Sequence, residues 1–69
     1  MSQLLVYRVL PTLAGGWSVH LDGEGSPSSL HERKGDAVVL ARVLAGHRHW
    51  VVVHDDKGNV PGWYPQWLH

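Results

Sequence analysis

Residues 34–46, KGDAVVLARVLAG, decide the fold of this chain, because they alone carry a helical pattern. At about 100° per residue, one face of this helix gathers apolar side chains. They are Ala37, Leu40, Ala41, Leu44 and Ala45. Val39 and Val43 extend the apolar arc round the other side, so Arg42 is the one plainly polar residue at mid-helix. A helix that is apolar nearly all round is usually buried on more than one side. We therefore expect protein to cover both faces of this helix.

Strand-like runs lie before and after the helix. Residues 4–10 are dense in leucine, valine and tyrosine, and they stop at Pro11, which cannot donate to a strand ladder. Residues 17–22 alternate between apolar and polar side chains, as in an antiparallel strand with one wet face. Residues 50–54, WVVVH, are rich in β-branched side chains and predict another strand. Residues 28–31 are compatible with a short extra strand.

This order predicts an α+β fold: a small antiparallel sheet in β-β-α-β order with one helix packed on one face. We expect a single domain over residues 1–69, with residues 1–3 loose and an aromatic tail at 61–69. The period of two in the strands and of 3.6 in the helix predicts the core between them. Its members are Trp17, Val19, Leu21, Ala37, Ala41, Leu44, Val51 and Val53.

Glycines mark two turns between these elements. Gly15 and Gly16 have the turn chemistry of a hairpin, since glycine accepts positive φ freely. Residues 55–59, DDKGN, follow the last strand-like run. In this second turn we expect Gly58 to hold a left-handed backbone conformation.

The start of the helix has two interpretations. Ser29 and Glu32 stand at the spacing of a capping box, in which each side chain bonds a free amide at a helix start. Gly35 would then lie inside the first turn, which favours a later start nearer Lys34.

Five short patterns stand in order along the chain: Tyr7-x-Val9-x-Pro11, Gly16-Trp17-x-Val19, Lys34-x-Asp36-Ala37 with Ala41 and Ala45, Val51-Val52-Val53-His54, and Gly58. As an ordered set they resemble the small bacterial family catalogued as domain of unknown function 2188, over residues 7–60. The resemblance implies a β-β-α-β unit, in agreement with the patterns above. The family usually shows a threonine at the helix start, where this chain has Arg33. It has no established activity, so it implies no catalytic residue.

Composition limits the function classes. With 69 residues, a domain buries only about 60% of the surface that its unfolded chain exposes, so it often relies on disulfides, a metal or a partner subunit. The chain has no cysteine, which excludes disulfides and fits a reducing cytoplasm, the location that we expect. No apolar run approaches the length of a membrane span, so we expect no membrane partner.

The charge weighs against nucleic acid as a partner. Six Lys and Arg residues balance six Asp and Glu residues, whereas a dedicated nucleic-acid binder carries a basic excess. A nucleic-acid-binding module that uses Arg33, Lys34 and Arg48 is therefore the second hypothesis, behind an interaction module.

Six histidines invite a metal hypothesis, which we rank third. His47, His49 and His54 would supply the three imidazoles of a known zinc arrangement. The alternative is surface histidines, with His54 bonded near the Gly58 turn. No motif spacing of a metal site, nucleophile elbow or phosphate loop is present, so we expect no enzyme, no cofactor and no resident metal.

The leading hypothesis is a non-enzymatic interaction module that self-associates through helix 34–46, as a dimer, or binds another protein. The candidate surface consists of Val39, Arg42, Val43, Trp63 and Trp67. The second apolar stripe of the helix is covered in one of two ways. Either a second copy packs there about a two-fold axis, which we prefer, or the aromatic tail folds over it.

Overall fold

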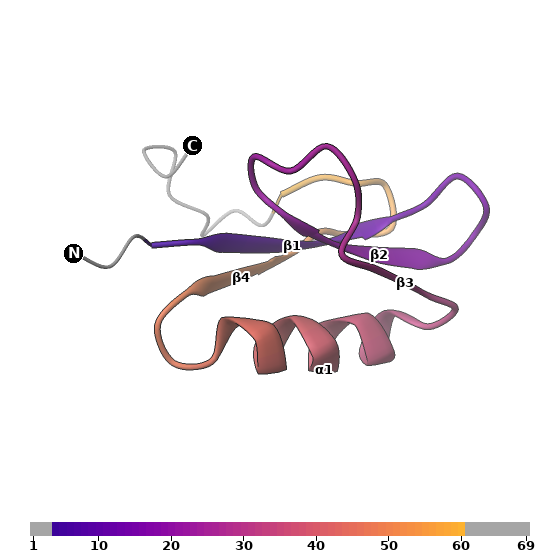
Figure 1. The fold of residues 1–69 in the computed structure, drawn as a ribbon. Coiled ribbons are helices and arrows are strands. Elements are labelled where there is room, and N and C mark those ends of the chain that lie inside the picture. Colours follow the sequence, from indigo (N-terminus) through magenta and orange to yellow (C-terminus); the bar gives the residue numbers. More distant parts are fainter. Residues whose placement is uncertain (1–3, 61–69) are drawn as a thin grey trace.

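The computed structural model describes residues 4–60 of the chain (Figure 1). Residues 1–3 and 61–69, the loose start and the aromatic tail of the sequence prediction, lie outside the described residues. The described part contains four strands and one helix: β1 (Val6–Pro11), β2 (Trp17–Leu21), β3 (Ser29–His31), α1 (Lys34–Ala45) and β4 (Trp50–Val53). The predicted α+β fold with one helix on one face is confirmed, and the extra strand within residues 28–31 is present as β3.

The sheet has the order β3-β2-β1-β4. The first three strands pair antiparallel, whereas β4 pairs parallel with β1, so the sheet is mixed rather than wholly antiparallel. The direction of β4 follows from the helix. The chain reverses its direction at each step from β1 through β2, β3 and α1 to β4, so β4 runs in the direction of β1. Parallel strands need a crossover connection of this kind. Figure 1 shows α1 along one face of the sheet, with the β2–β3 loop and the segment after β4 on the other side.

The helix begins at Lys34, the later of the two predicted starts. Arg33 occupies the N-cap position in an extended conformation and forms no side-chain cap bond, so no capping box opens the helix. At the other end, the Gly46 N–H donates to the Arg42 carbonyl oxygen at 2.9 Å. Gly46 has a φ of 60° there, which suits a residue without a side chain.

The core between the sheet and α1 is built on four fully buried side chains: Val9, Val19, Ala37 and Ala41. Around them pack the partly buried Tyr7, Trp17, Val38, Val51 and Val53. Most of the predicted core is therefore confirmed, with the partly buried Leu21 at its margin. The prediction for Leu44 is wrong, because this side chain is 42% exposed. The helix rests on a stripe of alanines, and their small side chains bring it so close to the sheet that Leu44 lies on the flank.

A second apolar cluster lies on the opposite face of the sheet. It joins Val6 of β1 to Val52 of β4, with Trp50 packed against both. Val52 is fully buried, whereas its neighbours Val51 and Val53 are partly exposed on the helix side. Both faces of β4 thus carry apolar side chains, which explains why its sequence does not alternate.

The turn after β4 confirms the prediction for Gly58, which has a φ of 83°. Its N–H donates to the Asp55 carbonyl oxygen at 2.9 Å. A Cβ atom built at Gly58 would meet nothing within 4 Å, so only the backbone conformation disfavours a side chain here.

Replacing Gly58 with valine is therefore expected to destabilise the fold more than the Gly58→Asn change does. Asparagine tolerates positive φ, and a β-branched residue does not. The left-handed conformation costs an ordinary residue about 1–2 kcal/mol, and we expect the valine variant to lose at least this amount. Chemical denaturation of both variants measures the difference. Equal losses would contradict a backbone origin of the glycine requirement.

Candidate functional site

The solvent-facing side of α1 is apolar at its centre. Val39 and Val43 are 62% and 71% exposed. Each lies about 160° round the helix from Ala41, the fully buried alanine at the centre of the opposite face. The exposed Arg42 stands beside them. The structure thus brings together the three predicted surface residues of the helix, whereas Trp63 and Trp67 lie outside the described residues.

Further side chains widen this apolar stripe on one flank of the helix. Leu40 is partly buried and Leu44 is 42% exposed, so part of each leucine is open to solvent. Asp36 is exposed in the first turn and sets the polar limit of the stripe at that end. Among residues 4–60, therefore, no segment covers the second apolar face of the helix.

The basic residues of the nucleic-acid hypothesis are not brought together. Arg33 and Lys34 stand at the start of α1, and Arg48 stands beyond its end. The 12 residues of the helix separate the two groups by about 18 Å. The Lys34 Nζ atom lies 4.9 Å from the ring centroid of Trp17, so this cation is directed toward the sheet.

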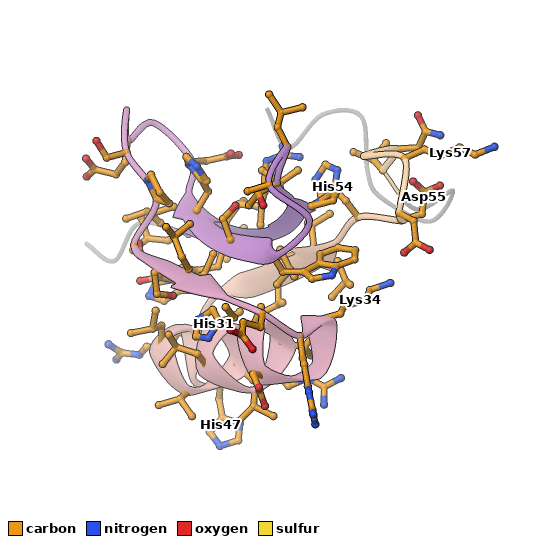
Figure 2. The ribbon with its side chains drawn as sticks, turned by 90° about the vertical axis from the view of Figure 1, so that its right-hand side faces the viewer. His31, Lys34, His47, His54, Asp55 and Lys57 are labelled. Atoms are coloured by element: carbon orange, nitrogen blue, oxygen red, sulfur yellow. The ribbon has the colours of Figure 1, made fainter. Side chains whose placement is uncertain are left out.

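The histidines of the metal hypothesis also lie apart. Figure 2 places His54 beside the sheet and His47 at the helix, on opposite sides of the molecule. The Nδ1 atom of His49 accepts a hydrogen bond from the Leu5 N–H at 3.0 Å. Within residues 4–60, no group of three or more His, Cys, Asp or Glu side chains is placed to hold a metal ion.

A chain of polar bonds crosses the sheet on the face away from the helix. The Arg8 guanidinium donates to both carboxylate oxygens of Asp22, at 2.6 and 3.2 Å. It also donates from Nη1 to the Nε2 atom of His54, at 3.2 Å. The Nδ1 atom of His54 in turn donates to the Gly58 carbonyl oxygen at 2.9 Å. This chain ties β1 to the residues that directly follow β2 and β4, and to the turn after β4.

These bonds select one tautomer of His54, a residue that is only 5% exposed. A carbonyl oxygen can only accept, so Nδ1 carries the hydrogen, and a guanidinium can only donate, so Nε2 carries none. His54 is therefore a structural residue with both ring nitrogens bonded. The sequence hypothesis that joined His54 to the Gly58 turn is right about the contact, but the side chain is buried rather than on the surface.

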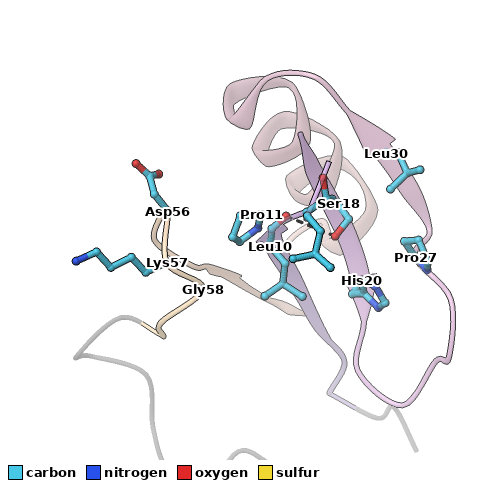
Figure 3. Close-up of a pocket in the computed structure, with 11 residues that line it drawn as sticks. Leu10, Pro11, Ser18, His20, Pro27, Leu30, Asp56, Lys57 and Gly58 are labelled. Atoms are coloured by element: carbon cyan, nitrogen blue, oxygen red, sulfur yellow. Dashed lines mark hydrogen bonds between the residues drawn. The ribbon is translucent and has the colours of Figure 1, made fainter. Parts of the chain in front are cut away.

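A groove of about 520 Å³ lies on the same side of the sheet (Figure 3). Pro27 and Leu30 flank it on one side, and the turn at Asp56 and Lys57 flanks it on the other. Ser18 lies within it, but its hydroxyl donates to the Leu10 carbonyl oxygen at 3.5 Å. The groove therefore has an apolar wall on one side, a charged turn on the other, and an engaged serine between them.

Comparison of the sequence with models of protein families shows which family the chain belongs to. The model of a family described as an uncharacterized protein conserved in bacteria (DUF2188) matches residues 7–62. The chain belongs to DUF2188. This confirms the resemblance drawn from the five ordered patterns. A search of curated proteins gave no match, and neither did a search of solved structures.

In this DUF2188 chain, the only helix of the described part is α1, with 12 residues. It is too short to cross a membrane, so no helix of the described residues could span one.

The turn after β4 holds a carboxylate in this DUF2188 chain. The Oδ1 atom of Asp55 accepts hydrogen bonds from the backbone N–H groups of Asn59 and Lys57, both at 2.9 Å. These bonds, that from Asn59 foremost, hold the pKa of the Asp55 carboxyl below its usual value. Asp55 and the exposed Asp56 therefore place negative charge directly after β4.

Proposed function

We propose that this DUF2188 chain is a small, non-enzymatic interaction module that self-associates through α1. The observation that carries the proposal is the exposure of Val39 and Val43, at 62% and 71%, at the centre of the helix face that points away from the sheet. Surface valines are common singly, but this pair forms a continuous stripe with the open parts of Leu40 and Leu44. Such a stripe gains stability when another apolar surface covers it.

A second copy of the chain fits this stripe. Valines at positions i and i+4 of a helix lie one above the other. Two antiparallel helices related by a two-fold axis would therefore set Val39 of each copy against the partner's Val43. Two-fold dimers are the commonest symmetric assembly, and a chain of 69 residues gains most from added burial. A different protein with a similar apolar surface is the alternative occupant.

The nucleic-acid alternative has weaker support. The chain carries a formal net charge of zero, and α1 separates Arg33 and Lys34 from Arg48. A duplex binder presents its cations on one surface, because phosphate contacts supply most of the affinity.

The Val43→Asp variant tests the helix contact. We expect its particle mass in sedimentation equilibrium to fall below that of the wild-type chain at equal concentration, since an unpaired charge in an apolar contact is strongly unfavourable. The Val43→Ile variant is the matched control and should keep the wild-type mass. Val43 is 71% exposed in the single chain, so the aspartate variant should still fold, which circular dichroism verifies.

Two outcomes would contradict the proposal. One is a wild-type chain that stays monomeric at high micromolar concentration. The other is an aspartate variant that keeps the wild-type mass. The first outcome would leave the aromatic tail at residues 61–69 as the predicted cover of the helix stripe. The second would mean that the chain associates without Val43.

A further inference from the structure

The chain leaves β2 through the sequence Asp22-Gly23, the one place where a glycine follows an aspartate. In such a pair the aspartate side chain can close a cyclic imide with the next amide nitrogen, because glycine has no side chain to shield that nitrogen. Gly23 is exposed and has a φ of 94°, and a Cβ atom built on it would meet nothing within 4 Å. The space around the Gly23 nitrogen is therefore open.

A tight turn leaves this nitrogen without a hydrogen bond. The Glu24 N–H donates to the Leu21 carbonyl oxygen at 3.0 Å, which closes a β-turn. Asp22 and Gly23 are the two central residues of that turn. The Asp22 N–H donates to the Val6 carbonyl oxygen at 2.9 Å, whereas no acceptor among residues 4–60 bonds the Gly23 N–H. The nitrogen that imide closure uses is thus available.

The other reactant, the Asp22 carboxylate, is held by Arg8 of β1. The Nε and Nη2 atoms of Arg8 donate to Oδ1 at 2.6 Å and to Oδ2 at 3.2 Å, so both oxygens are engaged. Nη1 of the same guanidinium donates to His54 at 3.2 Å, which fixes the guanidinium on its other side. The carboxyl has to leave these charge-assisted bonds before its carbon atom can bond to the Gly23 nitrogen.

We propose that Asp22-Gly23 is a site of spontaneous isoaspartate formation and that Arg8 suppresses the reaction in the folded chain. In the first step the Gly23 nitrogen attacks the Cγ atom of Asp22. The new N–C bond forms as the carboxyl OH and the amide hydrogen leave together as water. In the second step water opens the cyclic imide at either carbonyl carbon. One opening restores aspartate, and the other leaves the main chain running through the former side chain, which is isoaspartate.

Arg8 opposes the first step in two ways. It holds both carboxylate oxygens, as the two bond lengths show. In addition, loss of water requires a proton on the carboxyl, and a guanidinium has no acceptor for that proton because it can only donate. The structure therefore contains a reactive pair and the side chain that restrains it.

Isoaspartate at residue 22 would break the chain of polar bonds that crosses the sheet. The main chain becomes longer by a carbon atom at this point, and the side-chain carboxylate that Arg8 binds is lost. The tie between β1 and the residues that follow β2 would then be released. The β2–β3 loop lies on the side of the sheet away from α1 (Figure 1), so this inference is independent of the proposed association through the helix.

Incubation of the folded chain at neutral pH and physiological temperature tests the proposal. A protease that cleaves before aspartate does not cleave before isoaspartate, so the fraction left uncleaved at residue 22, at unchanged mass, measures the product. The Arg8→Gln variant should form the product about fivefold faster than the wild-type chain, since it lacks the ion pair that restrains Asp22.

Two controls use other parts of the same chain. Arg33→Gln makes the same change at an exposed arginine that forms no side-chain cap bond at the start of α1, and it should keep the wild-type rate. Cleavage before Asp36 serves as the standard within each digest. The amide that follows it, the Ala37 N–H, donates to the Arg33 carbonyl oxygen at 3.3 Å inside the helix, so Asp36 should stay cleavable.

Circular dichroism verifies that each variant keeps the fold. If Arg8→Gln does not fold, Arg8→Lys takes its place, because a single ammonium group does not hold both carboxylate oxygens as the guanidinium fork does. A folded Arg8 variant that forms isoaspartate no faster than the wild-type chain would overturn the role of Arg8. A lack of product at residue 22 in every folded chain would overturn the site itself. Neither result bears on association through α1, which the particle mass judges separately.

Discussion

Replacing Val9 with alanine is expected to lower the free energy of unfolding by about 2–3 kcal/mol. Val9 is fully buried in β1, between its partners Val19 on β2 and Val53 on β4, and beneath the alanines of α1. The change removes two buried carbon atoms, each contributing about 0.8 kcal/mol, and it leaves a cavity that the surrounding strands fill only in part. Because all three neighbouring elements meet at this side chain, the loss falls on the whole fold.

The control is the same substitution at Val43, on the exposed face of α1. Val43→Ala should change the free energy of unfolding by no more than about 0.5 kcal/mol, the size typical of surface positions. Urea denaturation of both variants gives the comparison. It is run at low protein concentration, since any association through α1 would add to the apparent stability. Similar losses at the two positions would show that Val9 is not at the centre of the core.

Leu44 shows what the helical pattern can and cannot predict. The period of 3.6 correctly places α1 on the sheet, but it defines an arc of positions and not the centre of contact. Leu44 is the more apolar residue in that arc, so hydrophobicity alone predicts that Leu44 is buried more deeply than the alanines. The structure centres on Ala41 instead, because small side chains allow the closest approach of helix and sheet. Leu44→Ala is accordingly expected to cost less than the loss of about 2–5 kcal/mol that a buried leucine entails.

The strands also have features that the sequence predicts and features that it does not. The alternation of residues 17–22 predicts β2 and its two faces, whereas the run at residues 50–54 has no alternation. The sequence therefore does not reveal that Val52 is buried on the face away from the helix, or that β4 runs parallel to β1. Both follow from the return of the chain through α1, which is a property of the whole fold.

The parts of the candidate site also differ in how well the sequence predicts them, because some depend on local contacts and others on distant ones. Val39 and Val43 are four residues apart on one helix, so local geometry is enough to predict that they share a face. Arg8 and His54 are separated by 46 positions, and only the assembled sheet brings them to 3.2 Å. The local sign that Arg8 has a buried partner is its position as a basic residue inside an apolar strand.

Enlarging Ala41 to leucine is the second change for which we expect a large effect, a loss of about 1–3 kcal/mol or more. Ala37 and Ala41 are fully buried and Ala45 is 3% exposed, so the helix meets the sheet along three methyl groups. A leucine in the middle of this stripe either lifts α1 from Val9 and Val19 or adopts a strained rotamer, and an overpacked core loses stability in both cases. Leucine is nearly as good a helix former as alanine, so helix propensity contributes little.

The matched control is Val39→Leu, which enlarges a side chain on the opposite face of the same helix. Val39 is 62% exposed, so this change should alter the free energy of unfolding by no more than about 0.5 kcal/mol. Urea denaturation of the two leucine variants, again at low concentration, compares the two faces directly. If the Ala41→Leu variant were as stable as the wild-type chain, α1 would have space beneath it. The alanine stripe would then not set the distance between helix and sheet. The stripe would also no longer explain why Val39 and Val43 point outward.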